Sequence, residues 1–130
     1  VLTRWCPWLA EMQPGMFVEI GTELAKEKGI KNGDRCIVSS ARGEVECSAI
    51  VTPRFKPFDI DGNMIHEIGI PWHFGWITTK DRTYSPGDKK AEVFTHGDSA
   101  NLLVPTIGDA NTMIPESKAF MANVAKKGVK

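Results

Sequence analysis

Two loops carry most of the side chains that could bind a ligand. Residues 69–75, with the sequence GIPWHFG, combine glycines that let backbone approach a ligand with flat aromatic rings and a histidine nitrogen. Residues 96–101, with the sequence HGDSAN, offer successive backbone N–H groups for an anion, and Ser99 and Asn101 add side-chain donors. The alternatives are a buried aromatic corner with a satisfied core histidine at His73, and a plain turn in the second loop. The composition of both loops is nevertheless typical of a ligand cradle.

Isolated charged residues could add to such a site. Arg4, Arg42 and Lys118 are cations able to meet a pyrophosphate, although a single charge on a turn is usually just solvated. The carboxylate of Asp98 or Asp109 matches the paired donors of a guanine, but acidic residues are also common in turns without a ligand.

The usual catalytic and metal-binding motifs are missing. The chain has no G-x-S-x-G and no H-E-x-x-H, and its three cysteines, Cys6, Cys36 and Cys47, have no C-x-x-C spacing. Cys36 and Cys47 lie in apolar, strand-like runs, where a free cysteine usually acts as a small buried hydrophobe. His66, in an extended run, is expected to have a packing or surface role. The sequence therefore predicts binding, with no catalytic residue and no metal ligand in this chain.

Size and charge narrow the class of protein. The chain has 130 residues, of which 42% are hydrophobic and 25% charged, as in one ordinary globular domain. Basic and acidic residues both number 16, so no net positive charge attracts nucleic acid. No apolar run approaches the roughly 20 residues that cross a bilayer. Because the chain starts at Val1 without a signal-peptide pattern, we expect a processed protein or a piece of a longer one.

Short strands must position these loops. We predict strands over 16–20, 35–40 and 44–51, the last two joined as a hairpin by 41–43. Thr22 to Lys28 reads as a helix, with Thr22 as N-cap and Gly29 as a left-handed C-cap.

The second half of the chain is also predicted to consist of short extended segments and loops. Residues 53–63 form a loop or edge passage with a turn at Asp61-Gly62, 64–70 are extended, 78–90 form a polar excursion, and 119–124 form a closing strand. Many short strands with one short helix favour a closed or nearly closed β-barrel.

In order, these segments resemble a known family. It is the C-terminal molybdopterin-dinucleotide-binding domain of molybdenum or tungsten oxidoreductases, and the similarity is closest to formate dehydrogenase large subunits of the exported, respiratory type. Nearly the whole chain takes part. The resemblance rests on residues 2–4, 9–14, 17–20, 23–34, 38–43, 69–75, 99–103, 108–112 (GDANT) and 115–118 (PESK).

The resemblance implies a fold, a cofactor and a set of contacts. The fold is mainly β with short helices, a double-psi β-barrel of the aspartate-decarboxylase-like kind. The cofactor is molybdopterin guanine dinucleotide, two per site, with tungsten or molybdenum, held jointly with domains outside this chain. By resemblance Asn101 and Lys118 contact it. Further residues that line the same cleft are Gly69, Pro71, Trp72, His73, Ser99, Arg4 and Arg42.

The same resemblance implies the setting of the domain. It would bind and orient the cofactor of an enzyme that oxidises formate to carbon dioxide, with the metal-ligating and catalytic residues in other domains. Its partners would be those domains and an iron-sulphur electron-transfer subunit, in the periplasm or alternatively the cytoplasm. The family usually has an aromatic residue where this chain has Ser117. It also begins earlier, so we expect residues 1–130 to be one such domain truncated at its N-terminal edge.

Two other functions are consistent with a barrel of this size. One is a separately encoded small subunit of a formylmethanofuran-dehydrogenase-type enzyme, which the length favours and the motifs do not. The other is a non-redox double-psi barrel that binds a peptide or adaptor, which would need neither the loop at Trp72 and His73 nor the loop at Asn101. Detection of a guanine dinucleotide and a metal in the purified protein separates these possibilities.

Overall fold

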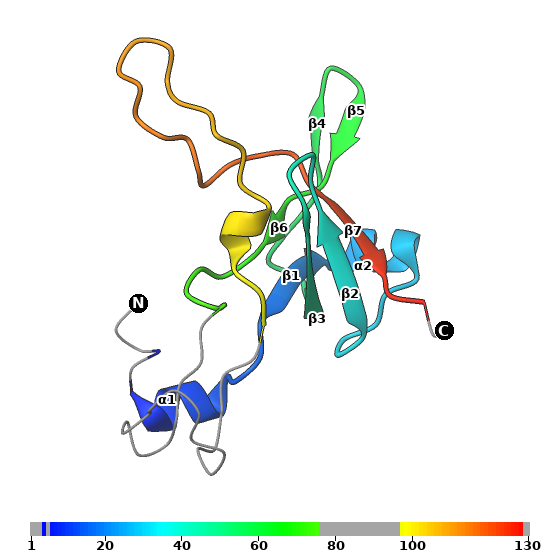
Figure 1. Cartoon of the computed structure of the whole chain (residues 1–130). Helices are drawn as coiled ribbons and strands as arrows, with labels where there is room; N and C mark the ends of the chain where they lie inside the picture. The colour runs from blue at the N-terminus through cyan, green and yellow to red at the C-terminus, as the bar shows by residue number, and fades with distance from the viewer. Residues whose placement is uncertain (1–3, 5, 76–96, 129–130) are drawn as a thin grey trace.

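A computed structural model describes residue 4, residues 6–75 and residues 97–128 of the chain (Figure 1). Short strands dominate it. In chain order the elements are α1 (Pro7–Met12), β1 (Phe17–Gly21), α2 (Thr22–Lys28), β2 (Arg35–Ser39), β3 (Glu44–Thr52), β4 (Phe58–Ile60), β5 (Asn63–Ile65), β6 (Ile68–Gly69), the 3-10 helix η2 (Ala100–Leu102) and β7 (Asn123–Lys126).

One curled sheet organises the described chain. Its strand order is β6-β1-β3-β2-β7, and a separate hairpin, β4-β5, stands beside it. β1 runs parallel to β3, from Phe17 opposite Ser48 to Gly21 opposite Thr52, while the other pairs are antiparallel. β3 therefore fills the place between β1 and β2 that the chain first leaves open. The mainly-β prediction is confirmed, and the curled sheet agrees with the expected barrel.

The core lies where the sequence alternates. In β3, Val45, Cys47 and Ala49 are buried, while Glu44, the first residue of the strand, is exposed. Cys36 and Cys47 pair across β2 and β3 and are fully buried, as predicted, and burial raises the pKa of the Cys47 thiol to about 12. The core cluster comprises Met16, Val18, Ile20, Leu24, Ala25, Ile30, Cys36, Val38, Val45, Cys47, Ala49, Phe74, Ala100, Leu103 and Val124.

Helix α2 has the predicted bounds but a different N-cap. Gly21 caps it, and the Thr22 hydroxyl instead donates to the Glu23 carboxylate. A methyl group at Gly21 would lie 2.3 Å from the Phe55 carbonyl oxygen, so the position requires glycine. Gly29 ends the helix with φ of 64°, and the Ile30 N–H donates to the Ala25 carbonyl oxygen, as in a left-handed C-cap.

Three elements differ from the sequence prediction. β7 begins at Asn123, because Ser39 at the end of β2 pairs with it; Phe120 precedes the ladder but still packs against the core. Helix α1 was not predicted. The run expected to be extended over 64–70 divides into β5 and β6, and the Asp61-Gly62 turn joins β4 to β5 as predicted. The predicted excursion at 78–90 lies outside the described residues.

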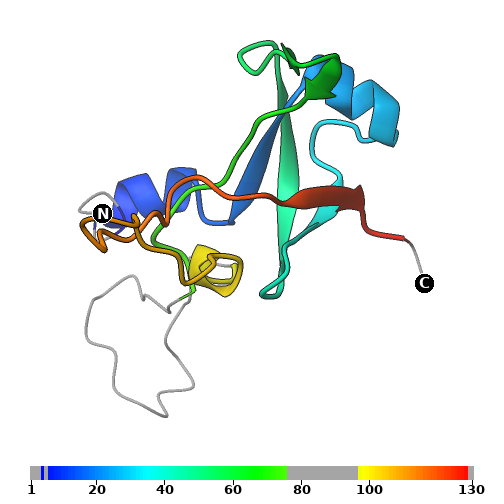
Figure 2. The same cartoon turned by 90° about the horizontal axis from the view of Figure 1, so that it is seen from above.

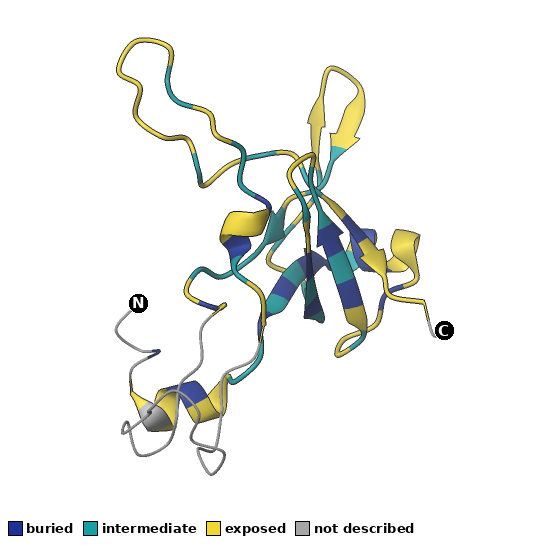
Figure 3. Cartoon of the chain, viewed as in Figure 1, coloured by how far each residue is buried: buried dark blue, intermediate teal, exposed yellow. Residues whose placement is uncertain are grey.

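Helices and projections surround the sheet unevenly. β1 connects α1 at one end to α2 at the other, which Figures 1 and 2 show from two directions. Buried residues gather in β1, β2, β3 and the inner side of α2, whereas the β4-β5 hairpin and the segment before β7 are mostly exposed (Figure 3). Loop 69–75 and η2 lie on the α1 side of the sheet, which places the candidate ligand-binding residues there.

Candidate functional site

Close backbone approaches bring the predicted loops together. A methyl group added at Gly75 would lie 2.8 Å from the Ser99 backbone nitrogen, and Gly75 has φ of 88°, so glycine lets loop 69–75 lie directly against Ser99. A methyl group at Gly43 would lie 2.9 Å from the Leu102 carbonyl oxygen. The β2-β3 turn that carries Arg42 therefore lies beside η2. Three segments distant in sequence converge, as the ligand-cradle hypothesis requires.

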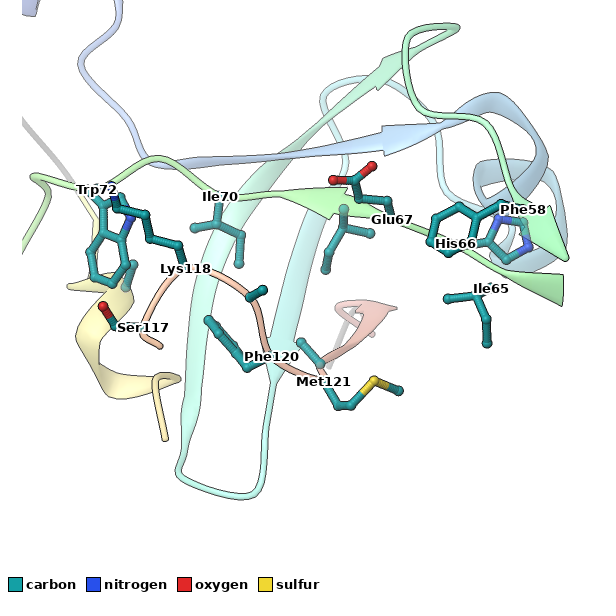
Figure 4. A pocket seen from close by; sticks show the side chains of 14 residues that line it. Phe58, Ile65, His66, Glu67, Ile70, Trp72, Ser117, Lys118, Phe120 and Met121 are labelled. Carbon is teal, nitrogen blue, oxygen red and sulfur yellow. The ribbon is translucent and has the colours of Figure 1, made fainter. Parts of the chain in front are cut away.

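One cavity opens between the run 65–72 and the C-terminal run 117–122. Its volume is about 310 Å³. Trp72 and Lys118, both predicted site residues, gather at one end with Ser117, and His66 lies at the other (Figure 4). The lining residues are Phe58, Ile65, His66, Glu67, Ile68, Ile70, Trp72, Ala100, Ser117, Lys118, Ala119, Phe120, Met121 and Ala122. Flat apolar walls with an ammonium group at one end suit a ring system that carries an acceptor or a negative charge.

A second cavity, of about 340 Å³, lies beside α1. It is lined by Arg4, Leu9, Gln13, Phe17, Pro71, Trp72, His73 and Phe74, so four of the predicted residues meet here. Trp72 borders both cavities. A ligand long enough to occupy both would pass this indole.

Arg4 is the most unusual residue of the second cavity. Its side chain is only 8% exposed, and its Nη1 donates to the Gln13 carbonyl oxygen at 2.6 Å. The guanidinium carbon lies 4.3 Å from the centre of the Phe74 ring. Nε and Nη2 are buried and find no acceptor among the described residues. Burial also lowers the pKa of the Arg4 guanidinium. A buried cation with two unpaired donors is costly unless an anion supplies the acceptors.

The histidine of loop 69–75 is presented outward. His73 is exposed and has φ of 74°, a left-handed conformation that is costly for a non-glycine residue. Phe74, 7% exposed, anchors the loop in the core. The alternative of a buried aromatic corner therefore describes Phe74, whereas the exposed His73 does not lie in the core. Gly69 lies in β6 against the Phe55 ring and borders neither cavity.

The loop at Ser99 is held by its own hydrogen bonds. The Ser99 hydroxyl accepts from the Asn101 N–H at 3.3 Å and so caps η2. The N–H groups of Leu102 and Leu103 donate to the carbonyl oxygens of Ser99 and Ala100. The exposed amide side chain of Asn101 is what this loop can offer a ligand at its surface. His96 lies outside the described residues.

The remaining predicted polar residues lie at the edge of the site or shape its loops. Arg42 is exposed, and its backbone N–H donates to the Ser40 hydroxyl. Asp98 accepts from the Glu46 N–H at 3.2 Å, and Asp109 accepts from Thr112, whose hydroxyl and N–H hold the pKa of that carboxyl below its usual range. Both carboxylates thus have a structural partner, and recognition of a guanine by either stays a prediction.

Sequence reasoning missed several lining residues. His66 was assigned a packing or surface role, but it borders the first cavity, and its Nε2 lies 3.5 Å from a Glu27 carboxylate oxygen. Phe120 and Gln13 line the two cavities from segments far from either loop. No local pattern indicates such positions, because they are set by how the sheet curls.

The described residues form no group of three or more His, Cys, Asp or Glu side chains that could hold a metal ion. In that same part of the chain, no helix has the length and apolar character needed to cross a membrane. A curled β-sheet with two cavities that share Trp72, one of them beside a buried guanidinium with two unsatisfied donor nitrogens, has the features of a binding module for an extended ligand with an anionic group.

Comparison with known families agrees with this class. Residues 1–121 match the sequence profile described as Molydopterin dinucleotide binding domain, and the chain belongs to that family. It is 48% identical over 126 residues to the formate dehydrogenase subunit alpha of Megalodesulfovibrio gigas, covering 97% of this chain and 11% of that protein.

Two further comparisons extend this result. The nitrate-inducible formate dehydrogenase major subunit of Escherichia coli is 43% identical over 114 residues, covering 88% of this chain and 10% of that protein. The chain thus spans about a tenth of the length of these curated relatives. Acetylene hydratase from Pelobacter acetylenicus shares the fold, with a TM-score of 0.58 and 15% identity over 92% of this chain and 15% of that one.

Proposed function

We propose that this chain holds and orients molybdopterin guanine dinucleotide in the large subunit of a formate dehydrogenase that oxidises formate to carbon dioxide. The observation that carries the proposal is the buried Arg4 guanidinium, whose two unpaired donors border a cavity that it shares with loop 69–75. A phosphate group supplies the acceptors that such a guanidinium lacks. Family membership and relatives named as formate dehydrogenases support the same function.

Different residues of the site would bind different parts of the cofactor. Arg4 would bind phosphate oxygens, with Pro71 and His73 beside it. Trp72 and Lys118 would hold a flat ring and its acceptor atoms in the first cavity, and Asn101, Ser99 and Arg42 would contribute from the edge. When bound, the cofactor supplies two-electron transfer at molybdenum or tungsten. The residues of this chain bind it, fix its orientation and exclude water from its polar groups.

The proposal extends to the wider assembly. Because they are about nine times longer than the matched region, we propose that residues 1–130 act as one domain and that the other domains supply the metal ligand, the catalytic residues and contacts to a second dinucleotide. An iron-sulphur subunit would accept the electrons. We assign the enzyme to the periplasm on its likeness to exported formate dehydrogenases, with the cytoplasm as the alternative.

The test is to substitute Arg4 in the full-length enzyme and to measure bound guanine nucleotide and metal by mass spectrometry. Arg4→Gln should lower cofactor retention by about ten- to a hundredfold, the range for losing hydrogen bonds to a charged group. Arg4→Lys keeps the charge but not the fork of donors and should be intermediate. Arg4→Gln also loses the hydrogen bond to the Gln13 carbonyl oxygen and the contact with the Phe74 ring, so thermal unfolding of each variant is measured beside its cofactor content.

Arg54→Gln is the matched control. Arg54 pairs with Glu19, its side chain is 67% exposed, and it borders neither cavity. This variant should keep its full cofactor content. Normal nucleotide and metal content in Arg4→Gln would contradict the assigned role. Purified wild-type enzyme without any dinucleotide would favour a binding module of another kind.

A further inference from the structure

Residues 106–116 form an arm that is ordered by its own hydrogen bonds. Gly108 and Pro115 are paired as an isolated antiparallel bridge. The Asp109 N–H donates to the Ile114 carbonyl oxygen at 2.9 Å, and the Glu116 N–H donates to the Ile107 carbonyl oxygen at 3.0 Å. No residue of the arm is buried, so packing against the core does not explain this order.

The tip of the arm is fixed as well. Asp109 Oδ1 accepts from the backbone N–H groups of Asn111 and Thr112 and from the Thr112 hydroxyl, at 3.1, 2.8 and 2.7 Å. The Met113 N–H donates to the Asp109 carbonyl oxygen at 2.8 Å. One carboxylate oxygen of Asp109 and the Thr112 hydroxyl are thus used within the tip. Beside exposed polar residues such as Asn111 and Glu116, the arm presents apolar side chains to solvent.

Three large apolar side chains stand on this arm in solvent. Ile107 is 55% exposed, Met113 75% and Ile114 63%. Figure 1 shows the arm projecting away from the sheet, and Figure 3 colours it as exposed or intermediate. A solvent-facing loop tip is normally polar, and an ordered tip that holds aliphatic groups out has the properties of a preorganised contact surface.

The arm is continuous with the candidate site. Its last residue, Glu116, is followed directly by Ser117 and Lys118, which line the first cavity. A protein surface bound to the arm would therefore lie beside the end of the first cavity that Ser117 and Lys118 line. An apolar surface there would complement Ile107, Met113 and Ile114, the three large aliphatic side chains that the arm exposes.

We propose that the arm docks into an apolar groove on another domain of the same large subunit and seats that domain beside the first cavity. The inference rests on the proposed function, in which this domain is part of a longer polypeptide. The length of the relatives supports that choice, since the chain covers 11% of the formate dehydrogenase alpha subunit of Megalodesulfovibrio gigas. Docking would bury Ile107, Met113 and Ile114 and hold the cofactor between the two domains.

The first experiment places a photo-crosslinking amino acid at Ile114 in the full-length enzyme and maps the products by mass spectrometry. The expected products lie within the same polypeptide and outside these 130 residues. Lys31, an exposed residue in the turn between α2 and β2, is the matched control position and should give far less of that product. Crosslinks to a different subunit or to a second copy, or yields no higher than at Lys31, would overturn the proposal.

The second experiment measures release of guanine dinucleotide from the holoenzyme. Ile114→Gln should speed release about tenfold, the factor for losing one buried aliphatic side chain. Ile60→Gln on the β4-β5 hairpin, 50% exposed in this chain, is the comparison variant and should release at the wild-type rate. Equal rates in both variants would overturn the arm proposal. A wild-type enzyme without dinucleotide would instead refute the proposed function, while the crosslinks would still report on the arm.

Discussion

The sheet and the loop region beside α1 differ in how fully their polar groups are hydrogen-bonded and in how relaxed their backbone is. In the sheet, Val18, Ile20 and Val38 are fully buried, and neighbouring strands satisfy one another's backbone groups. In the loop region His73 has a positive φ, and Arg4 keeps two buried donors unpaired. The sheet supplies stability and the loops retain unmet hydrogen-bonding capacity. Binding and folding should therefore be separable by mutation.

The largest effect should come from the sheet. Ile20→Ala removes a side chain that is 0% exposed and should lower the free energy of unfolding by about 2–5 kcal/mol. Trp72→Ala, half-buried between the two cavities, should cost less stability but reduce cofactor retention more. Urea unfolding and nucleotide content measure the two quantities. If both variants lost stability and cofactor in the same ratio, the division between sheet and loops would be wrong.

An intermediate loss of stability is expected where loop 69–75 contacts Ser99. Gly75→Ala places a methyl group 2.8 Å from the Ser99 nitrogen and forces alanine to φ of 88°, which should cost about 1–3 kcal/mol. Gly15→Ala is the control, because a methyl group there meets nothing within 4 Å. Thermal unfolding should separate the two variants. Equal stabilities would mean that loop 69–75 moves easily away from Ser99.

The smallest effect concerns the ion pairs that attach β7 to the sheet. A hydrogen bond from Lys126, 2.7 Å long, lowers the pKa of Asp34, and one from Lys127, followed by Arg35, lowers the pKa of Glu46. Because these folded-state pKa values are depressed, their stabilisation is present above about pH 4 and is lost as the pH falls through the folded values. Lys126→Met should flatten the acid side of a stability-against-pH curve slightly. An unchanged curve would show that this exposed pair contributes nothing.

Local patterns predicted the sheet far better than the site. β1, β2, β3 and α2 follow from alternation, turn residues and the Gly29 cap, all of which act over a few residues. α1 was missed because it spans only six residues, Pro7–Met12, too few for a helical period to be recognised in the sequence.

The site depends on longer-range geometry. Composition marks loops 69–75 and 96–101 as candidate ligand-binding loops, but only the family resemblance implies that they share a cleft. The burial of Arg4 requires Gln13 and Phe74 to meet around it. The first cavity likewise exists only because run 117–122 returns opposite run 65–72. Neither contact has a signal within one segment of sequence.

The position of Trp72 has a thermodynamic consequence. One indole forms part of the wall of both cavities, so a ligand group that displaces this indole in one cavity also changes the wall of the other. Occupants of the two cavities are then coupled, and their binding free energies will not add as independent terms. A fragment of the ligand that fills one cavity would set the shape met by the next fragment. The two cavities together would thereby favour ligands of a length that fills both.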